Sequence, residues 1–152
     1  MKMNKILTLL ILSLFLITSV YGKKEEPVKV EQVFTEKGDS VYLTINFKLS
    51  ENWMVYDSII GDGGPIPLTF DFSVLKNIVL VKIYKPTNLL EKYDDIFEVN
   101  MLYFKENVSY KFVFVKIDTN KSYNILGSLQ YMCCNLISGI CLAPKVIELK
   151  QK

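Results

Sequence analysis

The feature that most constrains the fold is a strict alternation of apolar and polar residues in the stretch SVYLTINFKL. Val41, Leu43, Ile45, Phe47 and Leu49 occupy every second position, and mostly polar residues fill the positions between them. A period of two is that of a β-strand with one buried face, whereas a helix would spread these apolar residues around its circumference. The chain is therefore expected to build its core from half-buried strands.

Further segments with the β-branched and aromatic composition of strands follow along the chain. They are Trp53–Ser58, Leu68–Phe72, Asn77–Tyr84, Met101–Lys105, Val108–Ile117, Ile125–Met132 and Lys145–Leu149. Residues typical of turns separate them, including the glycine-rich stretch Gly61–Pro67, which lacks the context of a nucleotide-binding loop. Residues 88–99 have a weak helical pattern and are interpreted as a loop with one turn. Eight or nine short strands predict an all-β, immunoglobulin-like antiparallel β-sandwich.

The N-terminus has the pattern of a secretory signal. Basic residues in Met1–Lys5 precede an apolar run from Ile6 to Val20, with small residues before a cleavage site after Gly22. A retained membrane anchor is the alternative, but the run is shorter than the ~20 residues that a spanning helix needs. The prediction is a signal peptide over residues 1–22 and one domain over residues 23–152, exported to the periplasm and not inserted in the membrane. Residues 23–32 are expected to be a flexible lead-in.

Charge excludes several classes of function for the exported domain. Residues 1–22 contain two lysines and no acidic residue, so the 18 basic residues fall to 16, against 16 acidic residues. A neutral chain with no arginine is a poor match for nucleic acid or anionic lipid. The absence of histidine excludes a Ser-His-Asp triad and any imidazole metal site.

All three cysteines lie in one segment, YMCCNLISGICLAP. Strand alternation separates the two adjacent cysteines, Cys133 and Cys134. The first shares a face with the apolar residues Ile125, Leu129 and Tyr131, and is expected to be buried in the core. Cys134 points the other way, together with Gln130 and Met132.

A short link leads from Cys134 to Cys141 and contains Ser138-Gly139. A hairpin of this length brings the two Cα atoms into the ~4.4–6.8 Å range of a disulfide, whereas a Cys133–Cys134 bond would need a strained ring between neighbours. Three cysteines cannot supply the four ligands of a structural zinc site, although Met132 with the thiolates is chemically suited to Cu(I). No cofactor beyond the cysteines is expected. Whether the bond is a structural staple or an exchangeable disulfide stays open on the residues alone.

Three blocks of the sequence resemble the N-terminal periplasmic domain of thiol:disulfide interchange proteins of the DsbD type. ENWMVYDSIIGDGGPIPLTFDF is similar to the family's aromatic strand and the loop of its Gly-Gly-Pro-Ile-Pro branch, and KYDDIFEVNMLYF to its acidic-aromatic cap loop. GSLQYMCCNLISGICLAPKVIEL is similar to the terminal hairpin. The order and spacing of the blocks agree from about Val33 to Leu149.

The resemblance implies protein-disulfide reductase chemistry on an immunoglobulin-like sandwich. Cys141 would form the mixed disulfide with thioredoxin-like partners, and Cys134 would resolve it. Asp94, Asp95, Ile96 and Phe97 would form a cap loop over the pair. Further aromatic residues would lie around the site: Trp53, Tyr56 and Tyr131.

Three features depart from the family pattern. The link between Cys134 and Cys141 has six residues, one more than in the enterobacterial form, and Cys133 is an additional cysteine. No transmembrane or thioredoxin-like domain is expected after the matched region, so a membrane electron donor is expected to act in trans. A hypothesis from another class is a non-catalytic secreted β-sandwich that binds a partner and carries a structural Cys134–Cys141 disulfide.

Overall fold

The computed structural model describes residues 26–61, 63–95 and 98–151. Eleven strands run through these ranges, and no helix occurs in them, so no helix of this part of the chain is long and apolar enough to cross a membrane. The strands are β1 (Val28–Lys37), β2 (Ser40–Leu49), β3 (Trp53–Ile60), β4 (Thr69–Lys76), β5 (Ile78–Tyr84), β6 (Leu90–Asp94), β7 (Val99–Phe104), β8 (Val108–Lys116), β9 (Asn124–Tyr131), β10 (Cys133–Asn135) and β11 (Lys145–Lys150).

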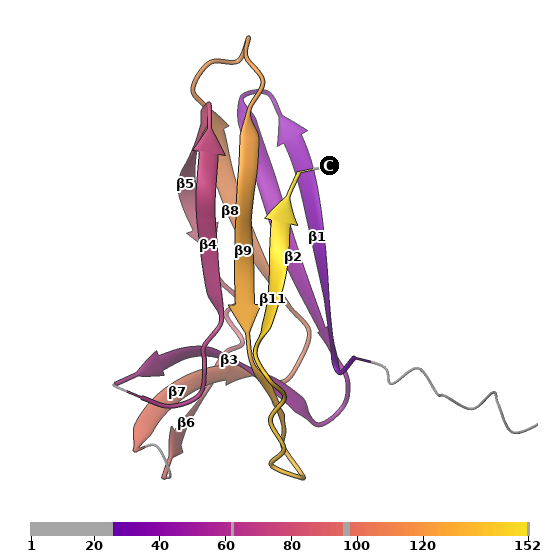
Figure 1. The fold of residues 1–152 in the computed structure, drawn as a ribbon, viewed down its shortest axis with the longest axis vertical. Helices are drawn as coiled ribbons and strands as arrows, with labels where there is room; N and C mark the ends of the chain where they lie inside the picture. The colour runs from indigo at the N-terminus through magenta and orange to yellow at the C-terminus, as the bar shows by residue number, and fades with distance from the viewer. Residues whose placement is uncertain (1–25, 62, 96–97, 152) are drawn as a thin grey trace, which may run out of the picture.

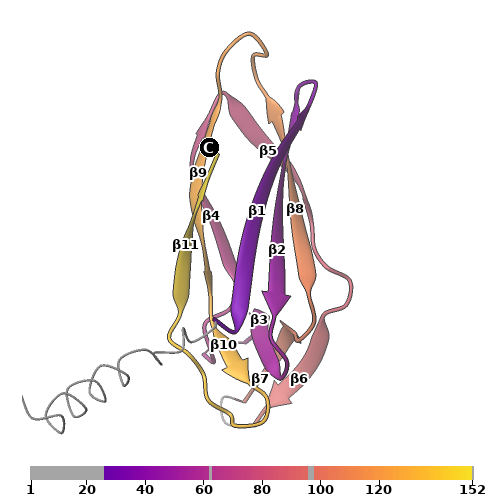
Figure 2. The same ribbon diagram turned by 90° about the vertical axis from the view of Figure 1, so that its right-hand side faces the viewer.

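Two sheets lie face to face and form the body of the molecule (Figures 1 and 2). One has the strand order β1-β2-β8-β5 and the other β11-β9-β4, with antiparallel pairing throughout. Aromatic rings join the two sheets: Phe72 of β4 packs against Phe112 and Phe114 of β8 at centroid distances of 5.1 and 5.2 Å. The predicted immunoglobulin-like β-sandwich is confirmed.

A third sheet, with the order β10-β3-β7-β6, lies at one end of the body (Figure 1). We call this sheet, with the link of residues 135–140 that follows β10, the tip. The smaller of two buried apolar clusters belongs to the tip, and the larger one fills the body.

The alternation in β2 determines where the body's core lies. Its apolar residues Val41, Leu43, Ile45 and Phe47 are fully buried, while the residues between them are only partly covered. The neighbouring strand β8 pairs with β2 from Ser40↔Val115 to Phe47↔Val108 and buries every second residue in the same way. The half-buried strands expected from the sequence are therefore present.

Two sequence predictions are wrong. Residues 28–32 are not a flexible lead-in, because β1 starts at Val28 and pairs with β2 along its whole length through a turn at Gly38 (φ 64°). Residues 88–99 are not a loop with one turn, because Leu90–Asp94 forms β6 and pairs with β7. Both strands keep most of their side chains at least partly exposed, so neither has the alternation that identifies a half-buried strand.

Candidate functional site

The candidate site forms where the chain leaves the body and enters the tip. β9 belongs to the sheet β11-β9-β4, and β10 belongs to the tip sheet, with only Met132 between them. The alternation of side chains continues across this change of sheet. Cys133 (5 % exposed) therefore packs in the body cluster with Tyr131, whereas Cys134 (2 % exposed) packs in the tip cluster. The predicted separation and the predicted burial of Cys133 are confirmed.

A disulfide joins Cys134 and Cys141, with Cα atoms 4.0 Å apart. The Asn135 N–H donates to the carbonyl of Ile140 and the Leu142 N–H to that of Cys133, both at 2.9 Å. One of these hydrogen bonds lies on each side of the cysteine pair. The two cysteines therefore face each other directly, at a non-hydrogen-bonded position of an antiparallel pair. Side chains come closest at such positions, so the backbone brings the two sulfur atoms together.

The two sulfur atoms differ in their surroundings. Cys134 is buried against Met54, its partner across β10 and β3, and against Tyr56. Cys141 follows the link and is exposed. A reagent approaching from solvent therefore reaches Cys141 more readily than Cys134.

Backbone hydrogen bonds and the Asn135 side chain order the link, which also has exposed apolar residues. The Asn135 Oδ1 accepts hydrogen bonds from the N–H groups of Ile137 (3.0 Å) and Ser138 (2.9 Å). Gly139 takes the left-handed conformation (φ 68°) that closes the turn. Three large apolar side chains of the link are exposed: Leu136 by 43 %, Ile137 by 78 % and Ile140 by 61 %. Sequence reasoning missed these residues, although their place between the cysteines was a signal.

The predicted aromatic residues divide between the two clusters. Tyr56 lies in the tip cluster with Cys134, while Tyr131 lies in the body, where its ring packs edge-on against Phe47 at 5.9 Å. Trp53 is partly buried, pairs with Asn135 across β10 and β3, and packs against the body cluster. The structure thus brings Tyr56 beside Cys134 and places Tyr131 with Cys133.

The predicted acidic residues lie at the other edge of the tip sheet. Asp94 ends β6, which two strands separate from β10, and Asp95 is exposed in the turn that follows. Adjacent strands are about 4.8 Å apart, so β6 and β10, at the two edges of this sheet, lie about 14 Å apart across the strands. The charge of Asp94 nevertheless acts on Tyr56: burial raises the pKa of Tyr56, and the charge of Asp94 raises it further. Ile96 and Phe97, also predicted for the cap, lie outside the described residues.

The third cysteine is in a poor environment for reaction. Burial raises the pKa of the Cys133 thiol, and the nearby charge of Lys145 opposes this only in part. Cys133 lines a small pocket of about 100 Å³ together with Tyr131, Leu142 and Lys145. Because the thiolate is the reactive form, a buried thiol with a raised pKa is expected to be inert.

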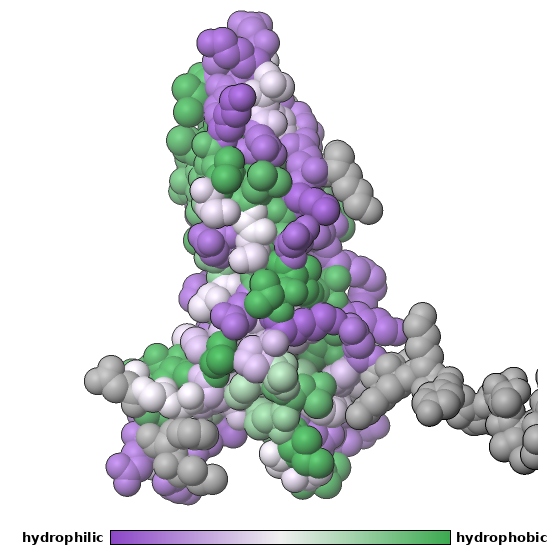
Figure 3. Space-filling view, in the orientation of Figure 1, coloured by the Kyte–Doolittle hydropathy of each residue, from purple (hydrophilic) through white to green (hydrophobic). Residues whose placement is uncertain are grey.

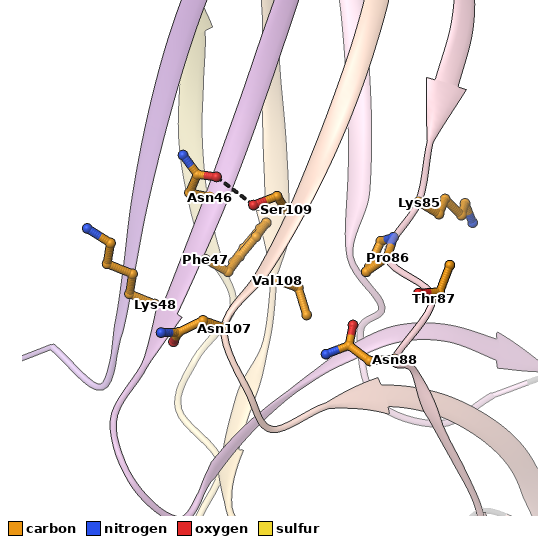
Figure 4. Close-up of a pocket in the computed structure, with 10 residues that line it drawn as sticks. All are labelled: Asn46, Phe47, Lys48, Lys85, Pro86, Thr87, Asn88, Asn107, Val108 and Ser109. Carbon is orange, nitrogen blue, oxygen red and sulfur yellow. Dashed lines mark hydrogen bonds between the residues drawn. The ribbon is translucent and has the colours of Figure 1, made fainter.

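A surface pocket of about 450 Å³ lies away from the cysteines (Figure 4). Residues of β2, of the segment after β5 and of the start of β8 line it. Its polar groups are mainly amides and lysines, and Ser109 donates a hydrogen bond to Asn46 across two strands. Neither a thiol nor a carboxylate is among the residues that line this pocket.

Comparison with known proteins finds a matching family and similar solved structures. The family described as "Thiol:disulfide interchange protein DsbD, N-terminal" matches residues 24–151. The crystal structure of the Neisseria meningitidis DsbD N-terminal domain in the reduced form is similar with a TM-score of 0.50 and 17 % sequence identity, over 80 % of this chain and 82 % of that one. At this identity the structural match supports the fold alone. No curated protein matches the sequence.

Proposed function

The chain belongs to the family of DsbD N-terminal domains, and from this premise we propose that it is a thiol–disulfide exchange module whose reactive pair is Cys134 and Cys141. The observation that carries the proposal is the unequal exposure of the two cysteine residues: Cys134 is 2 % exposed, and Cys141 is exposed beside the link. An exchange pair needs one sulfur that a partner can reach and one that resolves the intermediate.

The reaction follows from this arrangement in two displacements. A thiolate of the reductant attacks the Cys141 sulfur, a mixed disulfide forms, and the Cys134–Cys141 bond breaks with the electron pair left on Cys134. The second thiolate of the reductant then attacks its own half of the mixed disulfide and releases the Cys141 thiolate. The reduced pair passes two electrons to the disulfide of a client by the reverse sequence.

Thioredoxin-like domains are the proposed partners, with a membrane electron donor in trans as the source of electrons. The apolar side chains of Leu136, Ile137 and Ile140 stand next to Cys141 and support this proposal. Exposed apolar residues beside a reactive group favour contact with another protein surface. A protein partner would cover these three side chains during exchange.

We also propose that residues 94–97 act as a cap that restricts access to the disulfide. The effect of the charge of Asp94 on Tyr56, which shares a cluster with Cys134, supports a cap that reaches over the tip sheet. Replacing Ile96 and Phe97 together by alanine is expected to speed reduction by dithiothreitol. Tyr93→Ala, at an exposed residue of β6, is the matched control. Equal rates in the double variant and the control would remove the cap.

Residues 1–22 are proposed to be a signal peptide, and residues 23–152 a single periplasmic domain. The family match from residue 24 supports this boundary. N-terminal sequencing of the exported protein tests it, with Lys23 expected as the first residue. An N-terminus at Met1 in the exported protein would contradict cleavage.

A structural disulfide in a non-catalytic binding module is the second candidate. The hydrogen bonds on both sides of the Cys134–Cys141 pair favour this function, because the disulfide then stabilises a hairpin that these bonds already hold together. The reduction potential separates the two functions, since structural disulfides usually lie below about −300 mV and exchangeable ones above.

Trapping of the intermediate tests the proposed function directly. Cys134→Ser removes the resolving thiol, so a mixed disulfide through Cys141 is expected to accumulate with a thioredoxin-like protein on non-reducing gels. Cys141→Ser is the matched control and is expected to trap nothing, because Cys134 is buried. Trapping only in Cys141→Ser would reverse the two roles. Trapping in neither variant, with a potential below about −300 mV, would favour the structural disulfide.

A further inference from the structure

A buried carboxylate lies away from the disulfide and has one oxygen without a hydrogen bond. Asp57 is 5 % exposed and lies at an irregularity of β3, where the pairing with β7 shifts between Tyr56 and Ser58. The Tyr110 hydroxyl donates to its Oδ1. Its Oδ2 is buried and has no hydrogen-bond partner among the described residues. Buried polar atoms are rarely left unpaired, so this oxygen points to a missing donor.

Asp57 lines a cavity of about 190 Å³ with mostly apolar walls. The walls include Phe70 and Phe72 of β4, Leu80 of β5 and Phe112 of β8. Strands β4 and β5 end their respective sheets without pairing to each other, so the body is open along this flank. Figure 3 shows apolar side chains gathered on the side of the body where β4 and β5 lie.

Described residues of the glycine-rich stretch, which looks like a simple turn in the sequence, line the entrance to this cavity. Gly61 and residues 63–67 line a wider hollow of about 570 Å³, and this hollow shares Asp57, Leu68 and Lys85 with the cavity. Shared lining residues make the two spaces neighbours. A small molecule could therefore reach Asp57 from the surface between this loop and Lys85.

We propose that this cavity binds a small amphipathic amine, with its ammonium group on Asp57 and its apolar body between β4 and β5. An ammonium group supplies the missing donor to the buried carboxyl group. The volume of about 190 Å³ exceeds the roughly 150 Å³ of an apolar cavity that accommodates benzene. A phenyl ring with a short amine chain therefore matches the space.

Lys85 offers a positive charge near Asp57, so the experiment has to distinguish a cationic ligand from an anionic one. It is exposed and lines both hollows, so it would attract a carboxylate to the same entrance. The unpaired atom belongs to Asp57, however, and it requires a donor. A cation and an anion of equal shape should therefore bind very differently, with the cation preferred.

The experiment compares 2-phenylethylamine with 3-phenylpropionate by calorimetry and by NMR titration of the oxidised full domain. The amine is expected to bind saturably, with shifts at Leu68, Phe72 and Phe112, and the acid is expected not to. Asp57→Asn should weaken amine binding about tenfold or more, which is the value of one charge-assisted hydrogen bond.

A second pair of variants keeps Asp57 in place, in case Asp57→Asn does not fold. Leu80→Trp fills the cavity and should abolish binding, whereas Val81→Ala, at an exposed neighbour, should leave it unchanged. Thermal unfolding of each variant confirms that it is folded. Preferential binding of the acid, equal affinity of wild type and Asp57→Asn, or no saturable binding of the amine would overturn the proposal. The last result would indicate that water alone hydrates Asp57. None of these results depends on exchange at the cysteines.

Discussion

The body and the tip bury apolar residues to very different extents. In the body, large side chains such as Phe47, Phe112 and Phe114 are fully buried between two sheets. Among the described residues, the cluster buried in the tip consists of five, Met54, Tyr56, Val99, Met101 and Cys134, while Val55 and Phe104 of the same sheet belong to the body cluster. The link next to this cluster exposes Leu136, Ile137 and Ile140.

This difference places the disulfide in the more sparsely packed of the two regions. Local opening is easiest where few apolar contacts are made, and binding surfaces are drawn from such regions. The two adjacent cysteines pack in different regions, Cys133 in the body cluster and Cys134 in the tip cluster. Four predictions test how independent the two regions are.

The largest effect is expected from Phe112→Ala in the body. The ring of Phe112 is fully buried and packs against Phe70 and Phe72 at centroid distances of 4.8 and 5.1 Å. Its removal should lower the free energy of unfolding by about 3–5 kcal/mol, measured by urea denaturation. Under conditions where the variant stays folded, the rate of disulfide reduction should not change. A faster rate in the folded variant would show that the body controls the tip.

Reduction of the disulfide should have the next largest effect. The bond joins residues seven positions apart, so its loss should lower the free energy of unfolding by on the order of 2–3 kcal/mol. Amide hydrogen exchange should become faster in β10 and the link, while β2 and β8 keep their protection. Equal loss of protection in both regions would contradict their independence.

Alkaline pH should destabilise the body in part through Tyr131. Burial, and then the charges of Cys133 and Glu26, raise the pKa of Tyr131 to about 12. In the folded state the Tyr131 hydroxyl therefore keeps a proton that it loses near pH 10 in the unfolded chain. The stability that Tyr131 contributes is complete below pH 10 and is lost as the pH rises from 10 to about 12. Tyr131→Phe should reduce the alkaline loss of stability by on the order of 1–2 kcal/mol. The measurement is urea denaturation of both proteins at pH 9 and 12, and identical losses would contradict the prediction.

Cys133→Ala should have the smallest effect. Cys133 is 5 % exposed, and only a sulfur atom is removed, so the free energy of unfolding should fall by about 1 kcal/mol or less. Exchange through Cys134 and Cys141 should continue at the wild-type rate. Iodoacetamide should label Cys133 slowly in the native oxidised protein, because burial raises the pKa of its thiol. Rapid labelling would show that Cys133 is accessible.

Much of the body could be predicted from the sequence, because its strands bury one face. β2 has the bounds of the predicted segment, and β8 differs from its predicted segment only at the last residue. β1 and β6 could not be predicted, because tertiary pairing and not one-sided burial holds them in place. At the site, alternation assigned Cys133 and Cys134 to different faces. The tip cluster was not predictable, because residues of β3, β7 and β10 assemble it from distant parts of the chain.

The direct passage from β9 to β10 means that this segment should tolerate substitutions far better than changes in length. Because side chains alternate with a period of two, a one-residue deletion at Met132 would exchange the two faces of β10. Cys134 would move to the body position now held by Cys133, and Asn135 would face Cys141. An insertion would also reverse the faces. In relatives that share this passage, the number of residues between Tyr131 and the bonded cysteine should therefore vary less than the residue types.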